Sequence, residues 1–287
     1  MIDVSGFLMH YYCLGAGKPT VILEAGMADD SRLWTLVQDE VAQFTHVLSY
    51  DRAGLGWSAG HTDPPTSPFI AQRLHNLLQA AQVFGPYVLV GFSLGGIFLR
   101  RFAFEYPGEV AGMVLIDSSH ERLTIHVPWW DMAIRWSAVR YEALAQAPHE
   151  QRMAALARQP HLQSWPAHLL QAFIETLTPE NLLAMAREMK SHTENTGQNE
   201  ILLQSLGDMP LMVLEACDRD RDLAGFSTEK RKEFLTTWHD FQLEFTKLST
   251  HSEHRLIDSG HNIPMEAPQT VVDAIRDVVH RVRNKAC

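Results

Sequence analysis

The chain has 287 residues, of which 46% are hydrophobic and 20% are charged, and its formal net charge is −10. This composition is typical of a globular protein with a large core, and the length fits one large domain with an inserted segment. No basic stripe is present, so we expect no nucleic-acid partner. No uninterrupted apolar run approaches the length of a membrane span, so we expect no membrane partner either.

The N-terminal residues and the cysteines bear on where the protein works. Residues 1–6 have neither a basic start nor a following apolar stretch, so we expect no signal peptide. Cys13, Cys217 and Cys287 are odd in number and widely spaced, which indicates a reducing compartment without a disulfide framework. We therefore expect a cytoplasmic protein.

Fifteen histidines raise the question of a metal site. His251 and His254 come nearest to the spacing of metal ligands, but a polar loop face explains them better. We expect neither a metal nor another cofactor.

Short apolar runs alternate with helical patterns over residues 1–119 and 208–287, which indicates a mainly parallel sheet covered on both faces. Residues 120–207 instead show helical spacing broken by prolines, without a strand-like run. We therefore expect an α/β core domain made of residues 1–119 and 208–287, with residues 120–207 inserted as a helical cap. In chain order, strands are expected at 7–14, 20–23, 46–50, 86–90, 110–116, 210–214 and 255–257, and helices at 33–44, 69–84, 97–104, 228–248 and 271–282.

The stretch Gly91-Phe92-Ser93-Leu94-Gly95-Gly96 lies between an expected strand and an expected helix. A nucleophile elbow needs this context, because side chains next to the serine would clash in so tight a turn and glycines at 91 and 95 remove them. The turn exposes the serine oxygen near a helix N-terminus, which favours developing negative charge. A glycine-rich turn with an incidental serine is the alternative, and the flanking strand and helix favour Ser93 as a nucleophile.

Two further segments supply what a serine nucleophile requires. A hydroxyl is weak at neutral pH, and His261, in a small-residue loop after the last expected strand, is placed to take its proton. The order serine, acid, histidine along the chain fits this role. Gly26 follows a buried strand and lets the backbone fold back, so the amides of Met27 and Leu94 can form an oxyanion hole.

The acid that orients the histidine has two candidates. Asp117 ends an apolar strand and precedes two serines, which suits a carboxylate at the C-terminal edge of a sheet. Asp218 follows the next strand, but residues 218–222 alternate in sign and are typical of a solvated loop. We prefer Asp117, and Asp218 stays open. Asp51 precedes the nucleophile and adjoins Arg52, so we expect it to form a structural ion pair or to brace a loop.

Taken together, these segments resemble the α/β-hydrolase family over nearly the whole chain. The nearest subgroup is capped and esterase-like, with Glu-Ala-Gly in place of the more usual His-Gly of the oxyanion loop. Many members carry their acid where Asp218 stands, but the glycine that usually precedes it is missing here. The stretches that carry the resemblance are Leu23-Glu24-Ala25-Gly26-Met27, Tyr50-Asp51-Arg52-Ala53-Gly54-Leu55-Gly56, Gly91-Phe92-Ser93-Leu94-Gly95-Gly96 and Ser259-Gly260-His261.

The resemblance implies that Ser93 is the nucleophile, that His261 is the base and that the amides of Met27 and Leu94 form the oxyanion hole. Phe92 stands where a histidine is more usual, which should alter the wall of the pocket without removing the chemistry.

The expected cap holds four of the seven tryptophans. Most of them should pack the cap onto the core, but one or two, with Trp129 and Trp130 as candidates, should face an apolar cleft. We expect a serine hydrolase that cleaves a carboxylic ester of a small, partly apolar molecule through an acyl-enzyme. The alternatives are amide, lactone or carbon–carbon bond hydrolysis, cofactor-free peroxidase chemistry, or a non-catalytic ligand receptor. The sequence leaves the oligomeric state open.

Overall fold

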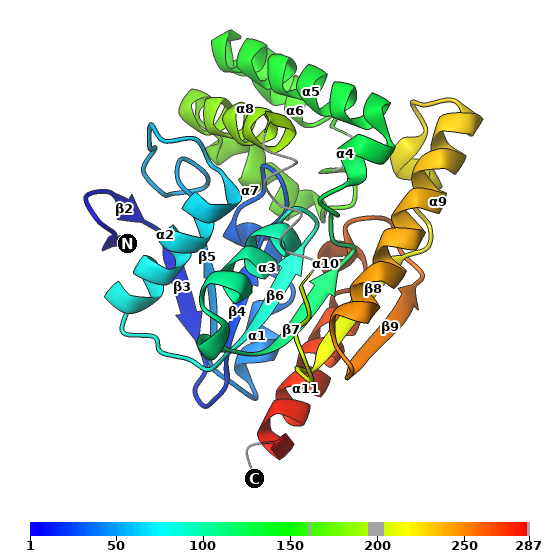
Figure 1. The fold of residues 1–287 in the computed structure, drawn as a ribbon. Coiled ribbons are helices and arrows are strands. Elements are labelled where there is room, and N and C mark those ends of the chain that lie inside the picture. The colour runs from blue at the N-terminus through cyan, green and yellow to red at the C-terminus, as the bar shows by residue number, and fades with distance from the viewer. Residues whose placement is uncertain (160–161, 195–203, 286–287) are drawn as a thin grey trace.

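The computed structural model describes residues 1–159, 162–194 and 204–285 (Figure 1). Residues 160–161 and 195–203 of the expected cap, together with Cys287, lie outside the described residues. The core is a seven-stranded sheet in which β3 is antiparallel to its neighbour and the other pairs are parallel. In spatial order the strands are β3 (Tyr11–Leu14), β5 (Val47–Tyr50), β4 (Thr20–Glu24), β6 (Tyr87–Phe92), β7 (Val110–Ile116), β8 (Leu211–Ala216) and β9 (Ser252–Ile257).

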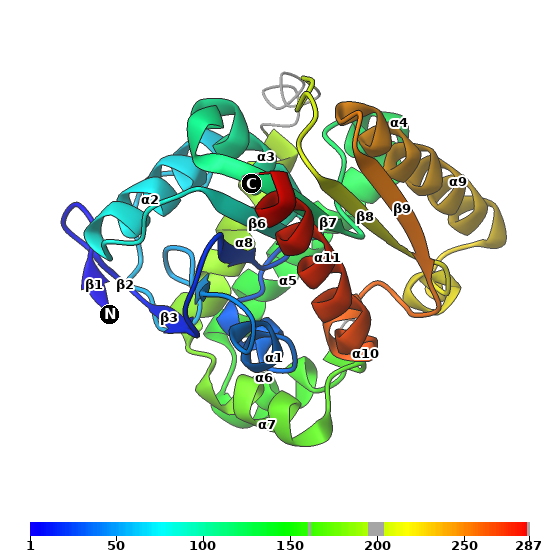
Figure 2. The ribbon, with the colours of Figure 1, turned by 90° about the horizontal axis from the view of Figure 1, so that it is seen from below.

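Helices cover both faces of this sheet (Figure 2). Alternate residues of one strand face opposite sides, so Val88 and Val90 of β6 enter one apolar cluster and Tyr87 and Leu89 enter another. The first cluster includes apolar residues of α1 (Gln38–Ala42) and α11 (Pro268–Lys285), and the second includes apolar residues of α2 (Ser67–Ala80) and α3 (Gly95–Glu105). Of α9 (Thr228–Phe245), only Phe245 enters the second cluster, because its other buried aromatic residues pack against the segment after β7. Burial on both faces explains why the strands read as continuous apolar runs.

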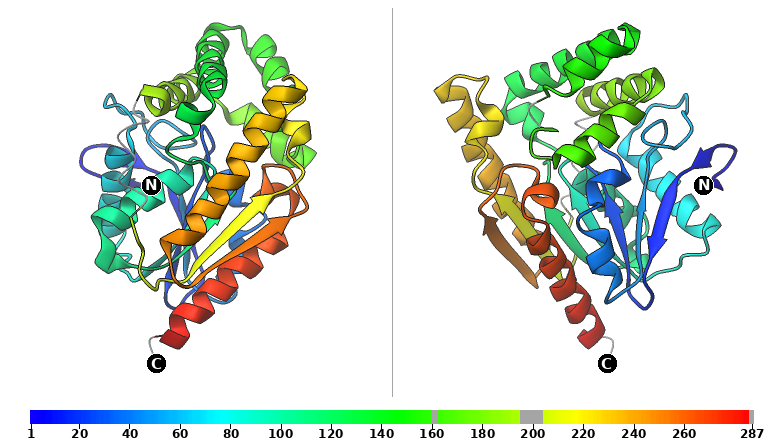
Figure 3. Two further views of the ribbon diagram at one scale, coloured as in Figure 1. Left: turned by 45° about the vertical axis from the view of Figure 1, so that its right-hand side comes forward. Right: turned by 180° about the vertical axis from the view of Figure 1, so that it is seen from behind.

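A helical insertion lies between β7 and β8, beyond the end of the sheet at which the parallel strands finish (Figures 1 and 3). α10 (Ile263–Glu266) lies in the loop between β9 and α11, at the same end of the sheet. No helix among the described residues is both long enough and apolar enough to span a bilayer. The helices of the insertion are α4 (Leu123–His126), α5 (Pro128–Gln146), α6 (His149–Leu156), α7 (Ala167–Thr176) and α8 (Pro179–Glu194).

Two expected elements differ from the structure. The expected strand at 7–14 is divided into β2 (Leu8–Met9), which pairs with β1 (Ile2–Asp3), and β3. The expected helix at 33–44 is a 3₁₀ helix at Ser31–Trp34 followed by the short α1. Thr35 explains the interruption, since its hydroxyl donates to the carbonyl of Arg32 at 2.7 Å and so competes with the helical hydrogen bonds.

Candidate active site

Ser93 and Asp117 directly follow β6 and β7, which are neighbours in the sheet. Both residues have left-handed backbones, with φ of 51° and 39°, a conformation that costs energy for residues other than glycine. The Ser93 amide donates to the Ile116 carbonyl at 3.0 Å, and the Asp117 amide donates to the Leu214 carbonyl at 2.7 Å. These hydrogen bonds to the adjacent strands hold the two strained residues next to each other at the C-terminal ends of β6 and β7.

The glycines around Ser93 are required by close approach. A Cβ on Gly91 would lie 2.8 Å from the backbone of Gly96, and a Cβ on Gly95 would lie 2.5 Å from the carbonyl oxygen of Ala25. The crowding that the sequence predicts for this turn is therefore present, and the absence of a side chain at 95 lets α3 begin directly against the end of β4.

His261 connects the two strand ends. Its Nε2 lies 3.0 Å from Ser93 Oγ, and its Nδ1 lies 2.6 Å from Asp117 Oδ2. In the tautomer with a proton on Nδ1, the imidazole donates to the carboxylate and accepts from the serine hydroxyl. The other carboxylate oxygen, Asp117 Oδ1, accepts from Trp238 Nε1 at 2.8 Å and from the Ala216 amide at 3.2 Å. This arrangement lets an imidazole take a serine proton while the carboxylate fixes its orientation.

Of the two candidate acids, Asp117 is the one that reaches the histidine. The Asp117 side chain is completely buried and bonded to the ring of His261. Asp218 is exposed, and its backbone amide donates to the Ser259 carbonyl at 3.0 Å. The catalytic role of Asp117 stays a prediction, now with a geometry that fits it.

Ser93, His261 and Asp117 form the candidate triad, and the charges around it favour an ionised Asp117 and a neutral His261. Burial by itself would raise the pKa of Asp117, but the cation of Arg219 and the hydrogen bonds from His261 and Trp238 hold that pKa below its usual value. Burial and the Arg219 charge lower the pKa of His261, although Asp117 and Asp222 act in the opposite direction. At neutral pH the imidazole is therefore free to accept a proton.

The amides expected to form the oxyanion hole lie at the ends of two elements. Leu94 immediately precedes α3, and Met27 lies three residues beyond the end of β4. Within the described chain, neither amide donates a hydrogen bond to another protein group. Both neighbours of Met27 are fixed, because the Gly26 carbonyl accepts from Arg52 Nη2 at 2.7 Å and the Ala28 amide donates to Glu188 Oε2 at 2.7 Å.

Asp51 and its neighbour Arg52 have different partners in the structure. Arg52 is buried and pairs instead with Glu24 of β4, at 2.6 Å, and with Glu188 of α8, at 2.6 Å and 2.9 Å. Asp51 accepts from the backbone amides of Ser31, at the start of the 3₁₀ helix, and of Trp57 in its own loop, and it contacts His10 Nδ1 at 2.9 Å, so its expected role as a loop brace is confirmed.

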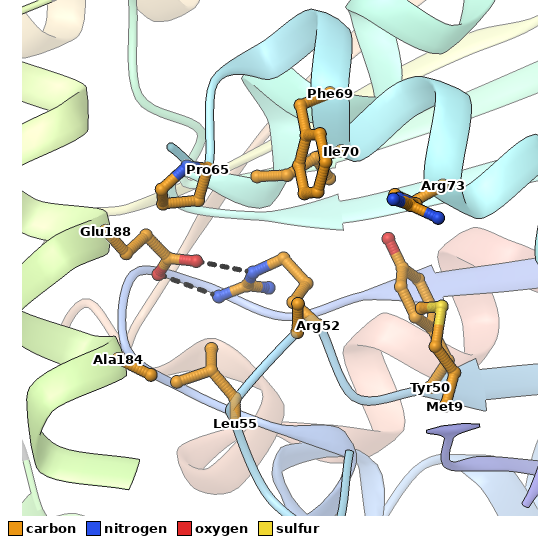
Figure 4. A pocket seen from close by; sticks show the side chains of 11 residues that line it. Met9, Tyr50, Arg52, Leu55, Pro65, Phe69, Ile70, Arg73, Ala184 and Glu188 are labelled. Carbon is orange, nitrogen blue, oxygen red and sulfur yellow. Dashed lines mark hydrogen bonds and ion pairs between the residues drawn. The ribbon is translucent and has the colours of Figure 1, made fainter. Parts of the chain in front are cut away.

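A hollow beside Arg52 is separate from the triad. It is a small space between α2 and α8 that is partly open to solvent. Figure 4 shows the Arg52–Glu188 pair across it, with Phe69 and Ile70 on another wall. None of the triad residues lines the hollow, so it does not adjoin the reacting atoms.

The three residues predicted to contact substrate have different surroundings. Phe92 is buried, with its ring centroid 4.9 Å from that of His261. Trp129 and Trp130 pack beside Phe234 of α9, with ring centroids 6.0 Å and 4.7 Å away. Both tryptophans thus pack against α9. That either of them also binds substrate stays a prediction.

The histidines considered as metal ligands have other partners. His254 Nε2 lies 2.7 Å from Glu215 Oε2, and His251 Nδ1 lies 3.0 Å from the Asp208 carbonyl. Over the described ranges, no group of three or more His, Cys, Asp or Glu side chains is arranged to hold a metal ion.

Sequence reasoning missed Arg219 and Trp238. The expectation that residues 218–222 form a solvated loop is wrong for Arg219, whose side chain is only 4% exposed. Its guanidinium carbon lies 4.2 Å from the ring centroid of Trp238, because α9 folds over this loop. The spacing of Phe234, Trp238 and Phe241 along one helix was the available signal of an inward face.

Solved structures of similar fold cover almost the whole chain. A thermophilic esterase from Thermogutta terrifontis is 21% identical with a TM-score of 0.66, and the match covers 98% of this chain and 97% of that one. An epoxide hydrolase from Bacillus megaterium is 16% identical with a TM-score of 0.74, and the match covers 97% of this chain and 99% of that one. At these identities the likeness shows the fold alone.

The sequence comparisons identify the family. An AB hydrolase superfamily protein of Gibberella zeae is 36% identical over 110 residues, which are 37% of this chain and 34% of that protein. The chain thus matches about a third of the length of that relative. The family model described as the alpha/beta hydrolase family matches residues 21–274. That match takes in all three triad candidates and most of the chain, so the chain belongs to the alpha/beta hydrolase family.

Proposed function

We propose that this protein is a serine hydrolase that cleaves a carboxylic ester of a small, partly apolar molecule through an acyl-enzyme. The observation that carries the proposal is the bonded series from Ser93 Oγ through His261 to Asp117, with distances of 3.0 Å and 2.6 Å. A hydroxyl, an imidazole and a buried carboxylate in this order allow the imidazole to activate the serine as a general base while the carboxylate orients it.

The residues act in two half-reactions. Ser93 Oγ attacks the ester carbonyl carbon while His261 Nε2 takes the hydroxyl proton, and the amides of Met27 and Leu94 receive the oxyanion. Collapse of this intermediate breaks the bond to the alcohol, which leaves with the proton from His261. Water then attacks the acyl-enzyme with His261 again as base, which releases the acid and restores the Ser93 hydroxyl.

The residue in the elbow favours acyl transfer over related chemistries. Relatives that open epoxides or remove halide use an aspartate where Ser93 stands, and a serine there leads to an acyl-enzyme instead. The described helices of residues 123–194 supply the apolar cap of the substrate cleft in this proposal. Amide, lactone or carbon–carbon bond hydrolysis uses the same groups, so only turnover of each substrate class separates them.

The test combines a substrate panel with substitution of the nucleophile. Purified protein is assayed on chromophoric esters of increasing acyl length, on matched amides and on lactones, with burst release of the alcohol as the sign of an acyl-enzyme. We expect ester turnover with a burst, and Ser93→Ala should lower it by ~10⁶, the loss found when a triad serine is removed. Ser205→Ala, at an exposed serine remote from the sheet edge, is the matched control.

Two outcomes contradict the proposal. A folded Ser93→Ala protein that keeps more than about a tenth of the wild-type rate removes Ser93 from the chemistry. Failure of a fluorophosphonate to label Ser93, together with no turnover of any substrate class, favours a ligand receptor instead.

A further inference from the structure

A buried cation lies against the acid of the triad. Arg219 follows β8 by three residues, and its Nη1 lies 3.3 Å from Asp117 Oδ2. The guanidinium carbon is 4.2 Å from the ring centroid of Trp238 and 5.1 Å from that of Phe234, both on α9. An arginine in this position is desolvated, and its charge acts on Asp117 with little screening.

The guanidinium and the imidazole meet at one oxygen. Asp117 Oδ2 is also the atom that lies 2.6 Å from His261 Nδ1. Among the described residues, the Nε and Nη1 atoms of Arg219 make no hydrogen bond, so their contacts with carboxylates are electrostatic. Its Nε lies 3.9 Å from Asp222 Oδ2, and this same oxygen accepts from the His261 backbone amide at 2.9 Å.

We infer that Arg219 is a positioning residue of the triad: it shares Asp117 with His261 and thereby sets the pH range in which His261 can take the proton of Ser93. The inference rests on the proposed serine-hydrolase function and adds a control of its working pH.

The sign follows from the groups that face the imidazole. Asp117 at the end of β7 and Asp222 after β8 stabilise an imidazolium, whereas Arg219 opposes it. Trp238 from α9 and Phe92 from β6 contribute uncharged rings on the other sides. Removing the Arg219 cation therefore leaves two carboxylates unopposed, so His261 keeps its proton to higher pH.

The same change affects the two ends of the pH profile differently. At acidic pH more of the enzyme holds a protonated His261, so a variant without the cation is slower. Above the midpoint the imidazole is neutral and more basic, so the variant reaches a plateau no lower than that of the wild type. A purely structural role for Arg219 lowers the rate at every pH and leaves the midpoint in place.

The experiment measures the rate at which a fluorophosphonate labels Ser93 between acidic and neutral pH, a readout that needs no knowledge of the natural substrate. Arg219→Met removes the charge and keeps an unbranched stem against Trp238, while Arg219→Lys keeps the charge. Arg231→Met, which removes a cation paired at 2.6 Å with Asp220 further along the same region, is the matched control.

We expect the midpoint of Arg219→Met to rise by on the order of one pH unit, with Arg219→Lys and Arg231→Met close to the wild type. A folded Arg219→Met protein with an unmoved midpoint overturns the inference. If that variant does not fold, Arg219→Gln decides, because it also removes the charge and should raise the midpoint in the same way, and an unmoved midpoint there also overturns the inference. A wild-type protein that is not labelled at any pH and turns over no substrate class refutes the hydrolase proposal itself.

Discussion

Arg52 and Arg219 are equally buried, each with a side chain 4% exposed, and each follows the end of a strand. Arg52 donates to Glu24, to Glu188 and to backbone carbonyls of the loop after β4 that is proposed to form the oxyanion hole. Arg219 lies on aromatic rings, with two of its nitrogens making no hydrogen bond, and contacts Asp117 through charge. We therefore expect Arg52, with its many hydrogen bonds, to contribute mainly to the stability of the fold. We expect Arg219, with fewer hydrogen bonds, to act mainly through its charge on Asp117.

The largest expected effect is on turnover and comes from changing Asp117, the carboxylate that Arg219 contacts. Asp117→Asn keeps the shape of the side chain but presents the wrong partner to His261, a change that costs ~10⁴ in turnover in chymotrypsin-type enzymes. Asp218→Asn, one residue before Arg219 and exposed, is the matched control and should cost little. Steady-state turnover measured beside circular dichroism checks both variants.

The assignment of the acid fails if the two results are exchanged. A folded and fully active Asp117→Asn enzyme beside an inactive Asp218→Asn enzyme would place the acid on the second loop.

The next largest expected effect is on the free energy of unfolding and comes from changing Arg52. Arg52→Met leaves the carboxylates of Glu24 and Glu188 buried without their cation, and breaking a buried pair in this way costs about 3–5 kcal/mol in the free energy of unfolding. Arg219→Met should cost less, because its nitrogens make fewer hydrogen bonds. Urea unfolding of the wild type and both variants at neutral pH measures the difference, and equal losses would remove the distinction between the two arginines.

The smallest expected effect is on the pH dependence of stability, through Asp29, a carboxyl group that the charge of Arg52 also influences. Burial and the neighbouring Asp30 charge raise the pKa of Asp29 to about 7, although Arg52 acts against them. The folded protein therefore binds this proton more tightly than the unfolded chain does. The resulting stability is fully present below the ordinary pKa of an aspartate and is lost as the pH rises through about 7.

We expect the free energy of unfolding to fall between the ordinary pKa of an aspartate and about pH 7, and Asp29→Asn should flatten that fall. Urea titrations at several pH values supply the comparison, with Asp63→Asn, at an exposed aspartate, as the control. If the free energy of unfolding depends on pH identically in the wild type and Asp29→Asn, the Arg52 charge keeps the pKa of Asp29 at its usual value and the prediction is wrong.

Local patterns were enough to predict much of the fold and the candidate triad. The strand before Ser93 and the helix after it lie within a few residues of the serine, so one short stretch carries the whole elbow. The position of Asp117 at the end of an apolar run predicts it as the acid, and the structure places its carboxylate beside His261.

The partners of buried charges were not predictable in this way. Arg52 and Glu188 are 136 positions apart, and no local pattern relates them. Arg219 lies in a segment of alternating charge that favours exposure, and its burial depends on how α9 packs over that loop. Such contacts join residues that are far apart in the sequence, so local sequence patterns do not predict them.

Glu188 has a consequence for protein engineering. The residue belongs to the helical insertion by sequence, yet its carboxylate supports Ala28, beside the proposed oxyanion amide of Met27, and binds Arg52 of the core. A chimera that exchanges residues 123–194 for the matching segment of a relative would therefore remove a support of the core together with the cap. The transferable unit is the insertion plus its arginine partner, and a library meant to change specificity should vary the other insertion residues while keeping positions 52 and 188 fixed.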